Sequence, residues 1–318
     1  MAPLDDTVRV CARCSLAFER VGGILDTLGA TPRTPEAAAV EAFYDVRPFP
    51  GYDAGDDGPT VIDRSRRSPF LVALDAAIAS DATVVDCGCG TGQLAAFLAL
   101  GGTRRRVIGI DMCLASLRCA DQFRRRARIV NLQLMRADLL DLPLEERSYG
   151  VVLSRGVVHH TSAPERAIES VARLVAPGGT LLLGFYETAA RLAHRARRVL
   201  GKALGRPLHV LDPVLRRRDL GEEKKRTWIA DQYQHPLEHC LPLPHVVAVL
   251  ERLGFRWVRT VPPACDRGDL FHALPKPSAA ALRALRTRWL LRGANDQDAG
   301  LVFIVARRAL EHQPDERS

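Results

Sequence analysis

The stretch VVDCGCGTGQLAAFLA (residues 84–99) decides the fold of this protein. Its apolar run ends in a turn that contains Gly88, Gly90 and Gly92, and an apolar helical pattern follows at once. Such a turn lets a ligand approach backbone N–H groups at a helix N-terminus. A dinucleotide-binding fingerprint would have its third glycine at position 93, which here is Gln93. The stretch therefore predicts a ligand-binding turn in an α/β fold and disfavours NAD.

Short apolar runs alternate with helical patterns on both sides of this turn. The expected strands cover residues 82–88, 106–112, 129–138, 150–156, 179–186, 255–261 and 301–307. The expected helices cover residues 69–79, 93–100, 114–128, 164–175 and 245–253, and Pro177-Gly178-Gly179 marks a turn before the fifth strand. Strands and helices that alternate with short links predict a parallel sheet with helices on both faces. The runs are apolar throughout, as in strands that are buried on both faces.

Three carboxylates stand at the ends of the first three of these strands. Asp86 lies two residues before the first glycine and suits a ligand with a positive end, such as an α-amino group. Asp111 ends the second strand, where an acid can accept hydrogen bonds from both ribose hydroxyls. Asp138 ends the third strand, where it can bind the exocyclic amine of an adenine. The carboxyl ends of parallel strands border one crevice, so we expect an aminoacyl nucleoside there.

This set of residues resembles the class I S-adenosylmethionine-dependent methyltransferases, and in particular their small-molecule, UbiE or type 11-like branch. The resemblance covers residues 70–186 and, by strand order, 245–308. It implies a Rossmann-like α/β fold with a seven-stranded, mostly parallel sheet, helices on both faces and an antiparallel final strand. It also implies S-adenosyl-L-methionine as the methyl donor. The cofactor-binding residues implied in this way are Asp86, Gly88, Gly90, Gly92, Asp111, Met112, Asp138, Leu139, Ser154 and Tyr44.

Methyl transfer from a sulfonium needs alignment of the acceptor and exclusion of water, and a base only where the acceptor loses a proton. His159 and His160 follow the fourth strand and are the candidate bases, although a histidine at such a place also often packs or caps. The segment DQYQHPLEH (231–239) resembles a region of the same family, which suggests that Tyr233 and His235 lie near the acceptor.

Two interpretations remain open for the aromatic segment FYDVRPFPGYD (43–53). In the first, Tyr44 and Tyr52 line the pocket, as segments upstream of the core do in some relatives. In the second, Phe43, Phe49 and Tyr52 only anchor an N-terminal arm.

We expect three regions along the chain: a ribbon-like N-terminal segment (1–30), a helical arm (31–80) and a methyltransferase domain (81–318). Cys11 and Cys14 have the spacing of half a zinc ribbon, but no second pair lies within the next 70 residues. A ribbon needs four ligands, so we expect a degenerate ribbon without metal rather than a zinc site. Residues 262–300 separate the last two strands and form an inserted arm of unknown role.

The net charge of +8 is concentrated in a basic helical insertion at residues 187–240. From residue 187 to residue 226 there are twelve basic and five acidic residues, a local excess of seven. A helix over residues 188–204 would carry one apolar stripe, made of Leu192, Ala196, Val199 and Ala203. The insertion is compatible with a lid over the acceptor pocket, with a site for an anionic acceptor or lipid surface, and with contact to RNA.

The 318 residues are 47% hydrophobic and 26% charged, which excludes a disordered or collagen-like chain. The sequence shows no transmembrane run and no signal peptide, and we expect a cytoplasmic enzyme. The expected function is methyl transfer to a small-molecule acceptor, with secondary metabolism as one setting and an anionic acceptor to be tested first. An RNA methyltransferase and a non-catalytic cofactor-binding protein are the alternatives. The methylated atom, the acceptor and the oligomeric state are not given by the sequence.

Overall fold

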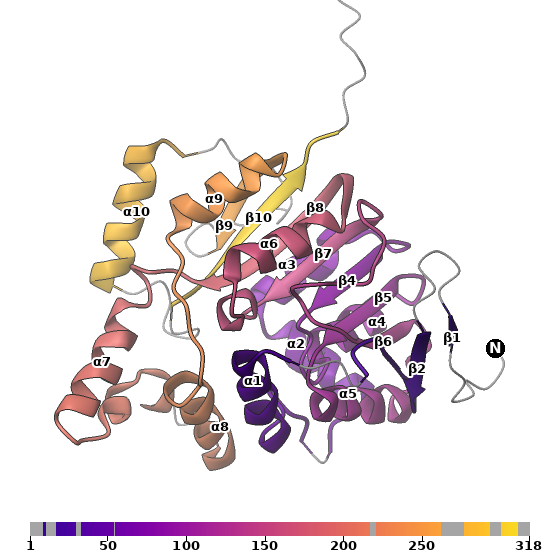
Figure 1. Cartoon of the computed structure of the whole chain (residues 1–318), viewed down its shortest axis with the longest axis horizontal. Helices are drawn as coiled ribbons and strands as arrows, with labels where there is room; N and C mark the ends of the chain where they lie inside the picture. Colours follow the sequence, from indigo (N-terminus) through magenta and orange to yellow (C-terminus); the bar gives the residue numbers. More distant parts are fainter. Residues whose placement is uncertain are drawn as a thin grey trace, which may run out of the picture.

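One mixed sheet organises the whole protein. The computed structural model describes residues 9–10, 17–29, 33–53, 55–216, 221–261, 277–292 and 300–310. Within these ranges the sheet has ten strands in the order β1-β2-β3-β6-β5-β4-β7-β8-β10-β9. Figure 1 shows the helices arranged around it, with α1, α7 and α8 gathered beside one end of the strands. No helix of the described chain is both long enough and apolar enough to cross a bilayer.

The elements follow the chain in a largely alternating order. The strands are β1 (Arg9–Val10), β2 (Ala17–Val21), β3 (Ile24–Asp26), β4 (Thr83–Cys87), β5 (Arg106–Asp111), β6 (Leu132–Arg136), β7 (Tyr149–Arg155), β8 (Val175–Tyr186), β9 (Phe255–Val261) and β10 (Leu301–Arg308). The helices are α1 (Pro35–Val46), α2 (Gly58–Arg66), α3 (Pro69–Ala77), α4 (Gln93–Gly101), α5 (Leu114–Arg126), α6 (Pro164–Arg173), α7 (Leu192–Ala203), α8 (Glu222–Tyr233), α9 (Leu243–Arg252) and α10 (Ala279–Arg292). Short 3₁₀ turns are η1 (Val158–His160), η2 (Leu208–Leu211) and η3 (Val214–Arg216).

Both faces of the central strands are buried, which explains their unbroken apolar runs. In β4, Val84 belongs to the core on one face of the sheet and Val85 to the core on the other. Successive side chains of a strand point to opposite faces, so each face needs its own cover. The first core is completed by α3, α4 and α5, and the second by α6, α9 and α10.

The predicted class of fold is confirmed, and β10 is antiparallel to both of its neighbours, β8 and β9. The strand number differs, because β1, β2 and β3 extend the expected seven strands at the β6 edge. These three strands are only two to five residues long, too short for a periodic apolar pattern. Helix α6 also ends earlier than expected, because β8 already begins at Val175. The Pro177-Gly178-Gly179 sequence therefore lies within β8, next to a shift in its register with β7.

A buried carboxylate joins the insertion to the sheet. Glu187 follows β8 directly and is fully buried. Its Oε2 accepts hydrogen bonds from the N–H groups of Ala189 (2.6 Å) and Ala190 (3.0 Å) before α7. Its Oε1 accepts from Leu243 N at the start of α9 (3.2 Å) and from Arg286 Nε on α10 (2.7 Å). One side chain therefore ties the segment before α7, the start of α9 and a side chain of α10 to the end of β8.

The helix expected over residues 188–204 is observed as the shorter α7 (Leu192–Ala203). An amphipathic helix usually buries its apolar face, whereas α7 exposes it. Leu192, Ala196, Val199 and Ala203, the predicted stripe, are exposed to solvent. The side that packs on the protein is instead polar, with His194 buried. The sequence predicted the stripe but not the face that the protein covers.

Replacing Glu187 by alanine is expected to lower the free energy of unfolding by about 3 kcal/mol, because it leaves a half-buried cation and three backbone N–H groups without their acceptor. Urea denaturation followed by circular dichroism measures this change. The control is Glu222→Ala, which removes an exposed carboxylate paired with Lys225 and should leave the midpoint unchanged. Equal midpoints for the two variants would contradict the anchoring role of Glu187.

Candidate functional site

Three carboxylates from neighbouring strands line one cavity. Asp86 and Asp111 lie near the ends of β4 and β5, and Asp138 follows β6. The cavity has a volume of about 460 Å³, and all three carboxylates belong to its lining. Because β4, β5 and β6 are parallel, their carboxyl ends meet at one edge of the sheet. The geometry thus brings together the three acids that the sequence singled out.

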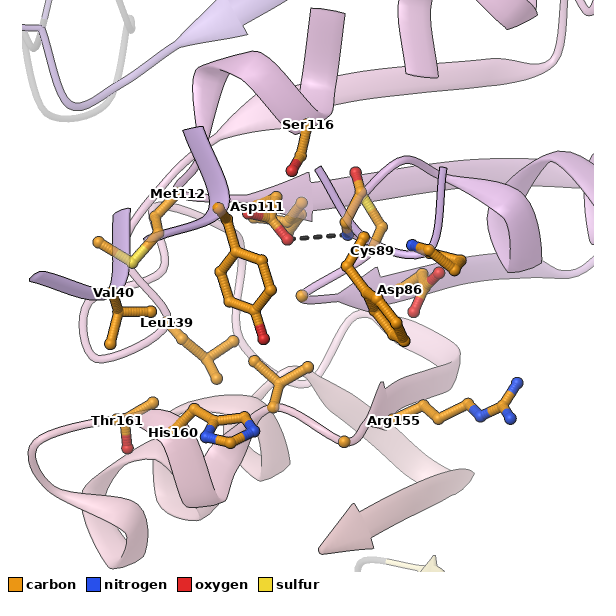
Figure 2. Close-up of a pocket in the computed structure, with 18 of the residues that line it drawn as sticks. Val40, Asp86, Cys89, Asp111, Met112, Ser116, Leu139, Arg155, His160 and Thr161 are labelled. Atoms are coloured by element: carbon orange, nitrogen blue, oxygen red, sulfur yellow. Dashed lines mark hydrogen bonds between the residues drawn. The ribbon is translucent and has the colours of Figure 1, made fainter. Parts of the chain in front are cut away.

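Asp111 fastens the glycine turn to the neighbouring strand. Its Oδ2 accepts a hydrogen bond from Gly90 N (2.8 Å), drawn as a dashed line in Figure 2, and its Oδ1 accepts one from Cys113 N (2.9 Å). Burial raises the pKa of the Asp111 carboxyl, and these two N–H groups act in the opposite direction. The acid is therefore held in a fixed orientation at the cavity wall.

Because two residues of the turn are glycines, neighbouring groups can pack directly against its backbone. A Cβ on Gly88 would lie 2.3 Å from a methyl group of Val157, and one on Gly90 would lie 2.5 Å from the carbonyl oxygen of Phe49. That carbonyl accepts a hydrogen bond from Thr91 N (3.2 Å). The arm that precedes the core therefore rests directly on the turn and closes one side of the cavity.

Asp86 is a carboxylate without a partner. It is 2% exposed, and it makes no hydrogen bond or ion pair with any described residue. Its pKa is raised to about 7, mainly by burial, with Arg155 lowering the pKa and Asp111 raising it. A buried carboxylate of this kind favours a bound cation or hydrogen-bond donor. The positively charged α-ammonium group of S-adenosylmethionine would meet this requirement.

The opposite end of the same space is apolar. Figure 2 shows Met112, Val40 and Leu139 gathered at one end of the cavity, with Asp86 at the other and Asp111 between them. Asp138 lies beside the apolar end, where its Oδ1 accepts from Leu140 N (2.8 Å). An amino acid end, a ribose and an adenine would meet Asp86, Asp111 and the Met112–Leu139 end in that order, so the residues present fit the cofactor.

A second part of the cavity is formed by α1, α8, the end of β8 and η1. Its polar side chains are Tyr44, His160, Tyr186, Asp231 and Gln232. Tyr44 Oη donates to Asp231 Oδ1 (3.0 Å), and Gln232 Nε2 donates to Asp231 Oδ2 (2.7 Å) and lies 2.7 Å from Tyr186 Oη. Burial raises the pKa of the Asp231 carboxyl. Figure 1 shows α8 beside α1, so the two helices close this part of the cavity together.

The two adjacent histidines have different environments. His160 lines the cavity, and its Nδ1 lies 2.7 Å from the carbonyl oxygen of Leu237. A carbonyl only accepts, so this Nδ1 carries the proton and Nε2 keeps its lone pair. Burial lowers the pKa of His160 to about 4, which keeps the ring neutral at pH 7. His159 is buried outside the cavity lining, with Nδ1 accepting from Tyr186 N (3.3 Å).

Some expected site residues lie outside the lining. Gly92 is the N-cap of α4, and Ser154 is buried in β7 with its hydroxyl unpaired among the described residues. His235 packs on His160, with ring centroids 3.7 Å apart. Tyr233 turns away from the cavity and donates to Asp212 Oδ2 (2.8 Å). Tyr52 stacks on a phenylalanine of α5 and so anchors the arm, whereas Tyr44 lines the cavity.

Other lining residues were not found from the sequence. Trp228, Asp231 and Gln232 of α8 line the cavity, as do Arg155 and Tyr186 at the ends of β7 and β8. The spacing i, i+3, i+4 places the three α8 residues on one helix face, which was the available signal. None of the basic residues of α7 lines the cavity. No group of three or more metal-binding side chains occurs in the described ranges, and Cys11 and Cys14 lie outside them.

Comparison with known proteins assigns the class of this domain. Residues 85–183 match the family described as "Methyltransferase domain", and this range contains all three strand-end carboxylates. The match identifies residues 85–183 as a methyltransferase domain of the class I S-adenosylmethionine-dependent type. The cofactor expected from the sequence is therefore that of its family.

Individual relatives share only parts of the chain. An uncharacterised protein of Synechococcus is 29% identical over 63% of this chain and 54% of its own length. A probable tRNA methyltransferase 9B of Mus musculus is 35% identical over 31% of this chain and 21% of its own. The chain thus spans about half, or less, of the length of these curated relatives. Among solved structures, PKMT2 of Rickettsia typhi in complex with AdoHcy has a TM-score of 0.52 at 13% identity, covering 78% of this chain and 54% of that one, which shows the fold.

The raised pKa of Asp86 predicts that cofactor affinity depends on pH. An α-ammonium group binds the ionised carboxylate, so the dissociation constant for S-adenosylmethionine should fall severalfold between roughly pH 6 and pH 7.5, with release of a proton. Titration calorimetry in two buffers of different ionisation enthalpy measures both quantities. Asp86→Asn should bind more weakly and lose the dependence, while the exposed control Asp141→Asn should behave as wild type. A persistent pH dependence in Asp86→Asn would refute this assignment.

Proposed function

We propose that this protein transfers a methyl group from S-adenosyl-L-methionine to a small-molecule acceptor held between α1 and α8. The observation that supports this best is the bridge between Tyr44 and Asp231, which joins the N-terminal arm to the insertion over the cavity. An acceptor beneath this bridge is limited to a size that the enclosed space admits, which favours a small molecule over a folded nucleic acid.

The protein side chains divide the work of the reaction. S-adenosylmethionine supplies a methyl carbon that is activated by its sulfonium. Asp86, Asp111 and Asp138 orient the donor, and Met112 and Leu139 cover its adenine. Tyr44, Asp231 and Gln232 hold the acceptor and exclude water from it.

His160 is our candidate for the proton acceptor. An acceptor atom that gains a methyl group while it still carries its proton would become strongly acidic. His160 Nε2 takes that proton, since its lone pair is free and its low pKa suits an acidic donor. His159 and His235 then act as packing residues that support the His160 ring.

The cytoplasm is our proposed compartment. Cys87, Cys89, Cys113, Cys119 and Cys240 form no disulfide among the described residues. Free thiols of this number are typical of a reducing environment.

Incubation with methyl-labelled S-adenosylmethionine and a cell extract tests the proposal. We expect label in the small-molecule fraction and not in RNA or protein. Label in RNA would instead favour an RNA methyltransferase, the activity in the name of the mouse relative that matches part of the chain. Cofactor binding without transfer to any fraction would indicate a non-catalytic protein.

Replacing His160 by glutamine is expected to lower kcat with the labelled fraction by roughly 10²-fold or more, with little change in the KM for the donor. At saturating donor, the wild-type kcat should not fall between about pH 8 and pH 6, because the pKa of His160 lies near 4. The matched control is His245→Gln, which alters an exposed histidine on α9. An unchanged kcat in His160→Gln would remove His160 from the reaction.

A further inference from the structure

The outer face of α7 is apolar although the helix lies on the surface. Leu192, Val199, Leu200 and Leu204 are all exposed, with Val199 at 66% and Leu204 at 63%. Residues at spacings of 0, 7, 8 and 12 lie on one side of a helix. A contiguous exposed patch of this kind is unusual and marks a surface that contacts something else.

Specific contacts hold α7 in this orientation. Arg191 and Arg198 both pair with Glu238, at 2.7 Å and 2.8 Å. His194 Nε2 lies 2.8 Å from the carbonyl oxygen of Gln232. Buried ion pairs and hydrogen bonds with partners on one side only fix the rotation of the helix. The polar face of α7 therefore packs against the rest of the protein, and the apolar face is exposed to solvent.

The turn that follows α7 also exposes apolar side chains. Val210 and Leu211 of η2 are exposed as well, Val210 at 59%. The end of α7 and η2 are neighbours, since a Cβ on Gly201 would lie 3.6 Å from the Cβ of Leu208. We call the exposed apolar side chains of both elements the α7–η2 surface. Its members are Leu192, Val199, Leu200, Leu204, Val210 and Leu211.

Every exposed charge from α7 through η2 is positive. Arg195, Lys202 and Arg206 are exposed, and no ion pair joins them to any described residue. Between Glu187 and Asp212 the sequence has no acidic residue at all. Arg195 and Lys202 are seven residues apart and therefore form one row along the edge of the apolar face. The complement of such a surface is apolar in its interior and anionic at its boundary.

We propose that the α7–η2 surface docks this protein on an anionic lipid bilayer, with α7 lying in the plane of the interface. Leucine and valine side chains enter the acyl boundary, and the flanking cations meet lipid phosphates and carboxylates. RNA would use the cations but would gain nothing from six apolar side chains. A second copy of the chain would cover the apolar face but would bring two rows of like charge together.

The patch lacks tryptophan and phenylalanine, so docking is reversible and needs both kinds of contact. Figure 1 shows α7 on the far side of α8 from α1, so a docked α7 leaves the cavity wall formed by α8 intact. The proposal does not depend on the reaction catalysed, and a variant without methyl transfer would still bind.

Vesicle co-sedimentation tests this directly. The full chain should bind vesicles that contain phosphatidylserine in phosphatidylcholine, and bind pure phosphatidylcholine at least roughly tenfold more weakly. The double variant Val199→Asp/Leu200→Asp should lose binding by about tenfold or more. The matched control, Leu290→Asp/Leu291→Asp, places the same charges on an exposed part of α10 and should bind as wild type. Circular dichroism of both variants checks that they are folded.

Equal binding of wild type and the α7 variant would overturn the proposal, as would absence of binding to the anionic vesicles. Analytical ultracentrifugation and an RNA-binding assay test the two alternative partners, a second copy of the chain and RNA. A wild-type dimer that the α7 variant dissociates, without vesicle binding, would assign the surface to a second copy. Salt-sensitive RNA binding that the α7 variant retains, without vesicle binding, would assign the cations to nucleic acid.

Discussion

The bond between Gly90 N–H and the Asp111 carboxylate is the interaction on which the site depends. Gly90 belongs to the turn after β4, and Asp111 ends β5, so the bond ties two neighbouring strand ends together. The same carboxylate is bonded on its other oxygen by Cys113 N at the start of α5. The Asp111 carboxylate therefore holds the glycine turn and the start of α5 against the same cavity wall. Pre-organisation of this kind makes three buried acids a binding site rather than a liability.

Much of this could be predicted from the sequence, because it depends on short-range patterns. Asp86, Asp111 and Asp138 follow apolar runs, and parallel strands bring such residues to one edge. Asp231 and Trp228 could not be predicted in the same way. They lie on α8, whose sequence EEKKRTWIADQY is charged at one end and mixed at the other, and only tertiary contacts with α1 decide which face looks inward.

The insertion shows the limit of reading one helix alone. Periodicity identified the stripe of Leu192 and Val199, but a stripe does not state what covers it. Glu238 lies far along the chain and pairs with Arg191 and Arg198, which turns the stripe outward. The positive charge that first suggested a ligand thus serves partly to orient a helix. What remains exposed is a surface for a partner and lies outside the cavity.

The central claim is that the carboxyl edge of β4, β5 and β6 binds S-adenosylmethionine. Titration calorimetry of Asp111→Ala with S-adenosylmethionine tests it most directly. The loss of a charged hydrogen-bond acceptor should weaken S-adenosylmethionine binding by at least about tenfold. The exposed control Asp81→Ala should bind S-adenosylmethionine with the affinity of wild type. Unchanged affinity in a folded Asp111→Ala protein would contradict the account.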